Sequence, residues 1–123
     1  MEGRRLFQAA AVWNAGAMLA SGALGQSGAR RRLGFEPAVD PLGWHLAALC
    51  VGLFGVAYLW ISRDPPRHGA LIRLGLLGKP LVFLLCLGHV FLGQAPPLVA
   101  AMGSGDLVFA VLFWRYLRRH PAA

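Results

Sequence analysis

Four apolar stretches, each about 20 residues long, constrain this 123-residue chain more than any other feature. At roughly 1.5 Å of rise per residue, a helix of that length crosses the hydrocarbon core of a bilayer. The stretches are continuous and lack polar alternation, so they predict helices and not strands. They cover residues 6–24, 42–61, 74–93 and 97–116. We therefore expect an all-α integral membrane protein, a four-helix bundle in which residues 1–123 form one domain.

The charge of the chain supports a membrane protein over a nucleic-acid-binding one. Hydrophobic residues make up 57% of the chain and charged residues only 14%, against about 25% charged residues in a soluble domain. The net charge is +7, but the arginines flank the apolar stretches instead of forming a basic patch with interleaved aromatic residues. We expect contacts with anionic lipid and none with nucleic acid.

The distribution of basic residues predicts the orientation in the membrane. If the N-terminus is inside, nine lysines and arginines lie on the cytoplasmic side and three lie outside, in the first loop at positions 30–32. The positive-inside rule then favours both termini in the cytoplasm (N-in/C-in). The nine are Arg4, Arg5, Arg63, Arg67, Arg73, Lys79, Arg115, Arg118 and Arg119. We expect a multi-pass protein of a bacterial inner membrane.

The first stretch also allows a second interpretation. Arg4 and Arg5 precede an apolar run that ends in the small residues 20–23, as in a cleavable signal peptide. Cleavage would leave three spans. The length of the run and the presence of Asn14 within it favour a membrane span.

The connections and the aromatic residues complete the expected layout. Residues 25–41 form the one long loop, paired prolines make residues 62–68 a stiff turn, and residues 94–97 form a tight hairpin. Trp13, near mid-membrane, is expected to pack, and small residues should let the helices approach closely. The aromatic residues expected in interfacial belts are Trp44, Tyr58, Trp60, Trp114 and Tyr116.

Three polar residues fall deep within the spans, where they are costly and each is a functional hypothesis. Asp106 lies about 13 Å and Asn14 about 15 Å below the outer boundary, so the two could hydrogen-bond across the bundle. Lys79 either extends to the cytoplasmic interface or forms an ion pair with Asp106, about 7 Å away along the axis. The cluster serves as a structural clasp or as a proton- or ion-binding site.

Two histidines and two cysteines form a second candidate site. His45 and His89 both lie about 5 Å below the outer boundary, and paired histidines on facing helices hold b-type haem in membrane bundles. Cys86 shares a face with His89, and Cys50 lies at a similar depth to Cys86 on another span, so copper is a second possibility. The alternative is that the histidines bond loops or water and that the cysteines pack. No cofactor is the simpler expectation.

The order of features resembles small bacterial membrane proteins of the DoxX-like type. The resemblance is carried by the segments AAVWNAGAML, GLFGVAYLWISRDPPRH, LGLLGKPLVFLL and GDLVFAVLFWRYL. It implies a four-helix bundle, and some such relatives are associated with redox enzymes at the membrane. No catalytic motif of that type can be carried over to this chain.

Three functions can be tied to particular residues or features, and a lipid-modifying enzyme without a visible signature is a fourth possibility. The first is a non-catalytic accessory or scaffold subunit that binds lipid, a membrane partner or a second copy of itself. The second is a small dimeric proton-linked transporter that uses Asp106, Lys79 and Asn14. The third is a haem- or metal-binding redox protein built on His45, His89, Cys86 and Cys50. The chain shows no phosphate-binding loop, HExxH or nucleophile elbow, which favours a protein without catalysis.

Overall fold

The computed structural model describes residues 2–24, 27–32, 34 and 41–121. All regular structure in these residues is helical, which confirms the predicted all-α class. The elements are α1 (Glu2–Leu24), α2 (Ser27–Arg32), α3 (Pro41–Arg63), the 3₁₀ turn η1 (Pro65–His68), α4 (Gly69–Phe91) and α5 (Pro97–Arg119).

Three helical stretches of the described residues are long and apolar enough to cross a membrane. They are Leu42–Arg63, Pro65–Phe91 and Pro97–Arg119. The fourth long helix, α1, is not among them, since polar Gln8 and Asn14 interrupt its apolar run. The structure therefore supports a membrane protein, while the fourth span stays a prediction.

The helices follow the predicted ranges with two corrections. The third range was expected to reach residue 93, but α4 ends at Phe91, where Leu92 N–H bonds Gly88 O at 3.0 Å and Gly93 takes a φ of 72° to turn the chain. The expected long loop contains the short helix α2. Residues 25–26, 33 and 35–40 of that loop lie outside the described residues.

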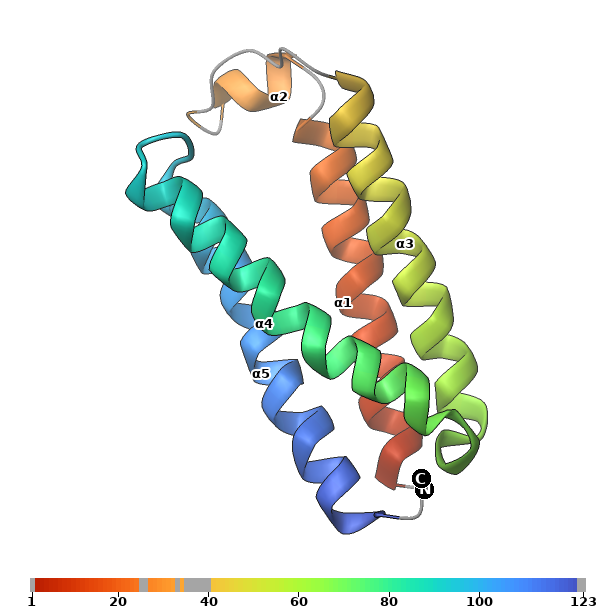
Figure 1. Cartoon of the computed structure of the whole chain (residues 1–123). Helices are drawn as coiled ribbons and strands as arrows, with labels where there is room; N and C mark the ends of the chain where they lie inside the picture. Colours follow the sequence, from red (N-terminus) through yellow and green to blue (C-terminus); the bar gives the residue numbers. More distant parts are fainter. Residues whose placement is uncertain (1, 25–26, 33, 35–40, 122–123) are drawn as a thin grey trace.

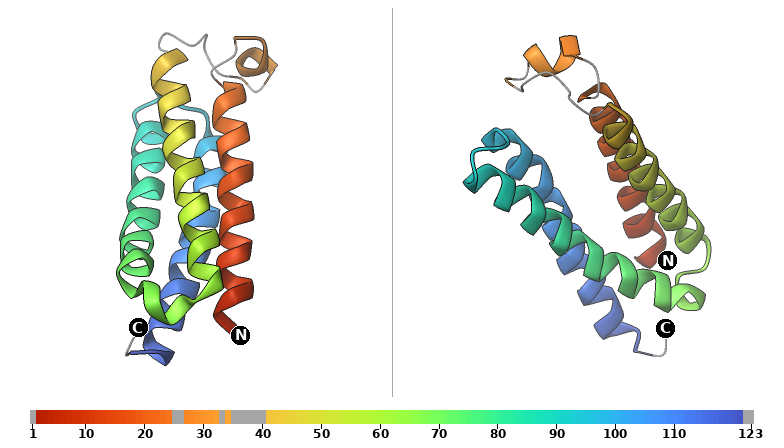
Figure 2. Two further views of the ribbon diagram at one scale, coloured as in Figure 1. Left: turned by 90° about the vertical axis from the view of Figure 1, so that its right-hand side faces the viewer. Right: turned by 45° about the horizontal axis from the view of Figure 1, so that its top comes forward.

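The four long helices form two antiparallel pairs, α1 with α3 and α4 with α5 (Figure 1). Helices pack along each other within a pair, whereas few contacts join one pair to the other. The pairs meet at the end that holds η1, the start of α1 and the end of α5, and they diverge toward α2 (Figure 2). We call these the closed end and the open end. This V differs from the compact bundle that the small residues predicted.

An aromatic core holds the closed end together. Phe7 of α1 contacts Phe113 and Tyr116 of α5, with ring centroids 5.0 and 5.4 Å apart. Tyr58 of α3 packs on Phe113 at 5.3 Å, and Ile72 of α4 is fully buried beside them. Each long helix thus contributes a large side chain to one cluster, which fixes how the two pairs cross.

Two of the expected belt residues belong to this core. Tyr58 and Tyr116 are 2% and 6% exposed, so the prediction that they lie at the membrane interface is wrong. A tyrosine near a helix end is consistent with an interfacial belt and with a packed core. The two can be distinguished only when the helix that faces the tyrosine is known. Trp60 and Trp114, by contrast, are about half exposed on the outer surface.

Candidate functional site

A cleft of about 660 Å³ lies between the two helix pairs on the side of the open end. All four long helices line it, mostly with apolar side chains. Beyond Trp13 and Asn14, toward the open end, the α1 lining consists of the small residues Gly16, Ala17, Ala20 and Ser21. Because such side chains cannot span the widening gap, the cleft follows from the sequence of α1. Its size falls within the range of small-molecule sites, roughly 300–1,000 Å³.

The floor of the cleft holds a buried ion pair. Lys79 Nζ lies 2.8 Å from Asp106 Oδ1, and Lys79 as a whole is 4% exposed. Both residues sit near the middle of their helices, α4 and α5. Lys79 therefore points into the molecule and does not extend to the cytoplasmic interface, and the predicted contact with Asp106 is present.

Asn14 connects the ion pair to the other helix pair. Its Oδ1 accepts a hydrogen bond from Lys79 Nζ at 3.2 Å, and its Nδ2 donates to Val51 O of α3 at 3.1 Å. The direct bond between Asn14 and Asp106 that depth alone suggested is replaced by this bridge through Lys79. The amide is 7% exposed, so a single side chain joins α1, α3 and α4.

Trp13 is a member of the cluster that the sequence did not predict. Its indole Nε1 donates to Asp106 Oδ1 at 3.3 Å. The ring also covers Gly105, where a Cβ atom would overlap it. A tryptophan within an apolar run predicts packing, as we expected of Trp13. The sequence signal for a polar role was the indole N–H donor of Trp13 directly beside the amide of Asn14. It becomes informative only once α5 is known to face α1 there.

Aromatic rings enclose the remaining side of the Lys79 ammonium. Its Nζ lies 5.1, 5.3 and 5.9 Å from the ring centres of Tyr58, Phe109 and Phe113. Cation–π contacts of this length are favourable, most of all where water is excluded. The ammonium is therefore held by an amide, a carboxylate and three rings, which compensates for its burial.

The Asp106 carboxylate is satisfied on one oxygen only. Both of its hydrogen bonds, from Lys79 and from Trp13, end on Oδ1. Among the described residues no buried side-chain oxygen or nitrogen lacks a partner, so Oδ2 is accessible. Asp106 is one of the residues that line the cleft, so a ligand there would lie beside a carboxylate with one oxygen that carries neither of these hydrogen bonds.

The histidines and cysteines of the second candidate site are dispersed. His45 lies in the first turns of α3 and His89 near the end of α4, which are the diverging ends of the two pairs (Figure 1). His89 Nδ1 lies 2.7 Å from Gln94 Oε1 in the adjoining turn. Cys50 and Cys86 are free thiols that line the cleft from opposite pairs. The described residues contain no cluster of three His, Cys, Asp or Glu side chains placed to hold a metal.

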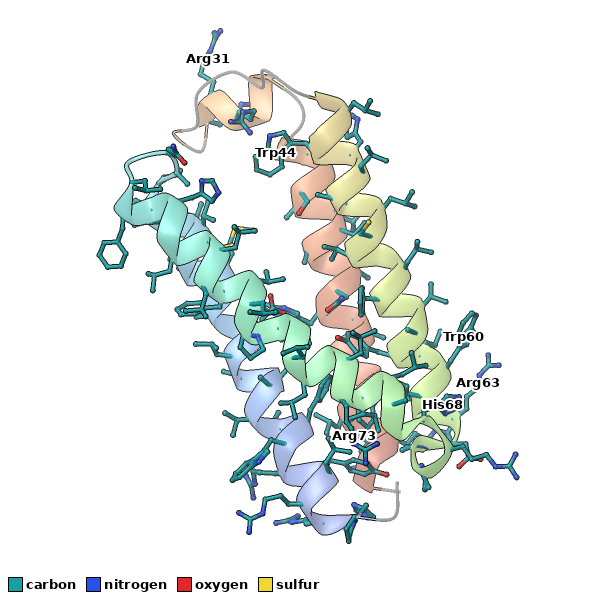
Figure 3. All side chains as sticks on the ribbon, viewed as in Figure 1. Arg31, Trp44, Trp60, Arg63, His68 and Arg73 are labelled. Carbon is teal, nitrogen blue, oxygen red and sulfur yellow. The ribbon has the colours of Figure 1, made fainter. Side chains whose placement is uncertain are left out.

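Arginines mark both ends of the molecule. Arg30 of α2 stacks on Trp44, with its guanidinium 4.9 Å from the ring centre, and Trp44 lines the cleft. Figure 3 shows Arg31 pointing away from the helices at the open end, and Arg63 and Arg73 at the opposite end. Positive charge at the open end thus lies above the mouth of the cleft.

No protein-family profile, curated protein or solved structure matches this chain significantly.

Proposed function

We propose that this chain is a four-helix inner-membrane protein of the bacterial DoxX-like type that binds an elongated apolar molecule in its cleft. In this proposal it is a non-catalytic, lipid- or partner-associated subunit. The cleft carries the proposal, because it is apolar, lies at the depth of the membrane-capable helices and has the size of a ligand site. Apolar molecules dissolved in the bilayer would reach it without crossing water.

The proposed orientation is N-in/C-in, with the open end outside. The start of α1 and the end of α5 lie at the closed end (Figure 1), together with all the cytoplasmic basic residues except Lys79, which is buried. Without Lys79, eight arginines remain on the cytoplasmic side against three outside, so the positive-inside rule still favours this orientation. Reporter fusions test it: activity of a cytoplasmic reporter placed in residues 25–41 would overturn the orientation.

Binding can be followed by tryptophan fluorescence. Trp13 and Trp44 line the cleft and Trp60 and Trp114 do not, so replacing the last two by phenylalanine leaves only reporters of the cleft. We expect brominated alkanols, added to the protein in mild detergent, to quench this fluorescence saturably. Quenching that rises only linearly with concentration, as for dissolution in the micelle, would overturn the proposal.

Two glycines of α4 give a matched control for the cleft. A Cβ atom at Gly78 or at Gly88 meets nothing within 4 Å, but only Gly78 lines the cleft. Gly78→Leu should therefore abolish saturable quenching, while Gly88→Leu should leave it unchanged. Equal effects of the two substitutions would place the bound probe elsewhere.

The position of the ion pair favours one second candidate, a dimeric proton-linked carrier. Lys79 and Asp106 both belong to the α4–α5 pair, and the bonds from Lys79 to Asn14 and from Trp13 to Asp106 join them to α1, while the two pairs share few other contacts. Protonation of the carboxylate would weaken these bonds and loosen one pair from the other. In proteoliposomes with an internal pH dye, a carrier would move protons when a cleft-binding alkanol is added, and folded Asp106→Asn would not. An unresponsive wild-type protein would remove this candidate.

A further inference from the structure

The free oxygen of Asp106 limits what the cleft can bind. A carboxylate oxygen removed from water needs a hydrogen-bond donor, since an unsatisfied buried polar group carries its full desolvation cost. The protein donates hydrogen bonds to Oδ1 alone, and Asp106 is one of the residues that line the cleft. A purely apolar occupant would cover this oxygen without replacing its water. An occupant that ends in a donor would satisfy it.

The charges around the cleft indicate that this donor is neutral. Lys79 already balances the charge of Asp106 at 2.8 Å, so the floor has no net charge to attract a cation. At the open end, Arg31 and Arg32 are exposed and Arg30 stacks on Trp44, which lines the cleft. From the part of the chain that the structure describes, a cation would thus meet positive charge at the mouth and a neutral pair at the floor. A hydroxyl or a neutral N–H group meets no such opposition.

From this geometry we infer that the cleft selects amphiphiles with a neutral hydroxyl or N–H end, which donates to Asp106 Oδ2 while the apolar chain extends toward Trp44. This inference rests on the proposed function and names its ligand class. The chain has room to extend. Trp44 precedes Val51, whose carbonyl marks the floor, by seven residues of α3, or about 10 Å along the helix.

The test compares two probes that differ in one hydrogen-bond donor. The first is 8-bromo-1-octanol, and the second is its methyl ether, which keeps the oxygen and the bromine but cannot donate. Because the hydroxyl lies at the floor, the terminal bromine of the alcohol should quench Trp44 more than Trp13 in versions that keep one of these tryptophans. Hydrogen bonds to charged groups predict that the alcohol binds at least about tenfold more tightly than the ether.

Asp106→Asn should remove that preference. The donors Lys79 Nζ and Trp13 Nε1 keep the amide oxygen at the position of Oδ1, so the amide nitrogen takes the place of Oδ2 and offers a donor. The ether should then bind as tightly as the alcohol. If this variant does not fold, the double variant Lys79→Met/Asp106→Leu removes the acceptor without leaving a charge unpaired, and it should also bind the two probes equally.

The outcomes separate the inference from the proposed function. Tighter binding of the alcohol in the wild type, lost in either variant, supports the inference. Equal saturable binding of alcohol and ether by the wild type overturns the inference and leaves the apolar cleft as the ligand site. Preferential quenching of Trp13 by the terminal bromine overturns the inferred direction of the chain. Absence of saturable quenching by either probe overturns the proposed function itself.

Discussion

The two ends of this molecule are built from the same four helices, yet one is packed and the other is open. At the closed end the residues that face the opposite pair are large, and Phe7, Tyr58 and Phe113 fill the space between the pairs. At the open end α1 presents Gly16, Ala17 and Ala20. Within each pair the packing continues past the closed end, so the difference arises only between the pairs.

The comparison shows how helices of this kind can combine rigidity with a binding site. In lipid, helices associate through close packing and polar contacts and not through the hydrophobic effect. Large side chains at the closed end supply the close packing, and the cluster of Lys79, Asp106 and Asn14 supplies the polar contacts near the middle of the helices. Beyond that level the two pairs diverge (Figure 1), and the cleft lies between them.

Loss of a core ring should affect the closed end far more than a similar truncation affects the open end. Phe113 is fully buried among rings of three other residues, so Phe113→Ala should lower the free energy of unfolding by about 3 to 5 kcal/mol. Val99→Ala, in the lining of the cleft, should lower it by about 1 kcal/mol or less. Unfolding in mixed micelles measures both. Equal losses would contradict the difference between the ends.

Removal of the Asp106 carboxylate from the floor of the cleft should lower the free energy of unfolding about as much as Phe113→Ala does. Asp106→Leu leaves the buried Lys79 ammonium without its carboxylate, which should cost about 3 to 5 kcal/mol of stability. Lys79→Met/Asp106→Leu leaves no unpaired charge, and its stability should return to within about 1 kcal/mol of the wild type. The same unfolding assay decides this, and a double variant as unstable as the single one would show that the ion pair itself stabilises the fold and that the loss does not come only from an unpaired charge.

These contacts mark the limit of what the sequence predicted. The four helical ranges and the contact between Lys79 and Asp106 depend on local periodicity and axial rise, which can be worked out for each helix separately. The role of Trp13 and the burial of Tyr58 depend on which helix faces them. The V shape follows from the sizes of side chains that face each other across the two helix pairs. These residues are far apart in sequence, so no local pattern predicts it.

A methyl group at the level of the floor should begin to separate the pairs. A Cβ atom at Gly105 would overlap the Trp13 ring, so Gly105→Ala should lower stability by about 1 to 2 kcal/mol, as expected for overpacking. Gly88→Ala meets no neighbour within 4 Å and should instead gain about 0.4 to 1 kcal/mol from reduced freedom of the unfolded chain. Thermal unfolding in detergent distinguishes them. A stabilised Gly105→Ala would mean that the ring moves freely.

The hydrogen bond of Trp13 should make the smallest contribution. Trp13→Phe keeps an aromatic ring but removes the donor at 3.3 Å from Asp106, in a partly exposed position. We expect a loss of about 0.5 to 1 kcal/mol. Trp60→Phe, on the outer surface of α3, should change stability by less than about 0.5 kcal/mol. If Trp13→Phe lowered stability more than Asp106→Leu does, the indole of Trp13 would be the main contact between the helix pairs.

The pattern of polar contacts also bears on how such a chain would enter a membrane during synthesis. Lys79 finds its carboxylate on the neighbouring helix α5, and Asn14 finds a carbonyl on α3. Each hairpin therefore contains a partner for its own buried polar side chain, which lowers the free-energy cost of placing that side chain in lipid. A translocating machinery could release the α1–α3 hairpin before α4 has left the ribosome, and the α4–α5 hairpin would follow with the charges of Lys79 and Asp106 already paired. The bonds from Lys79 to Asn14 and from Trp13 to Asp106 would form when the two hairpins meet.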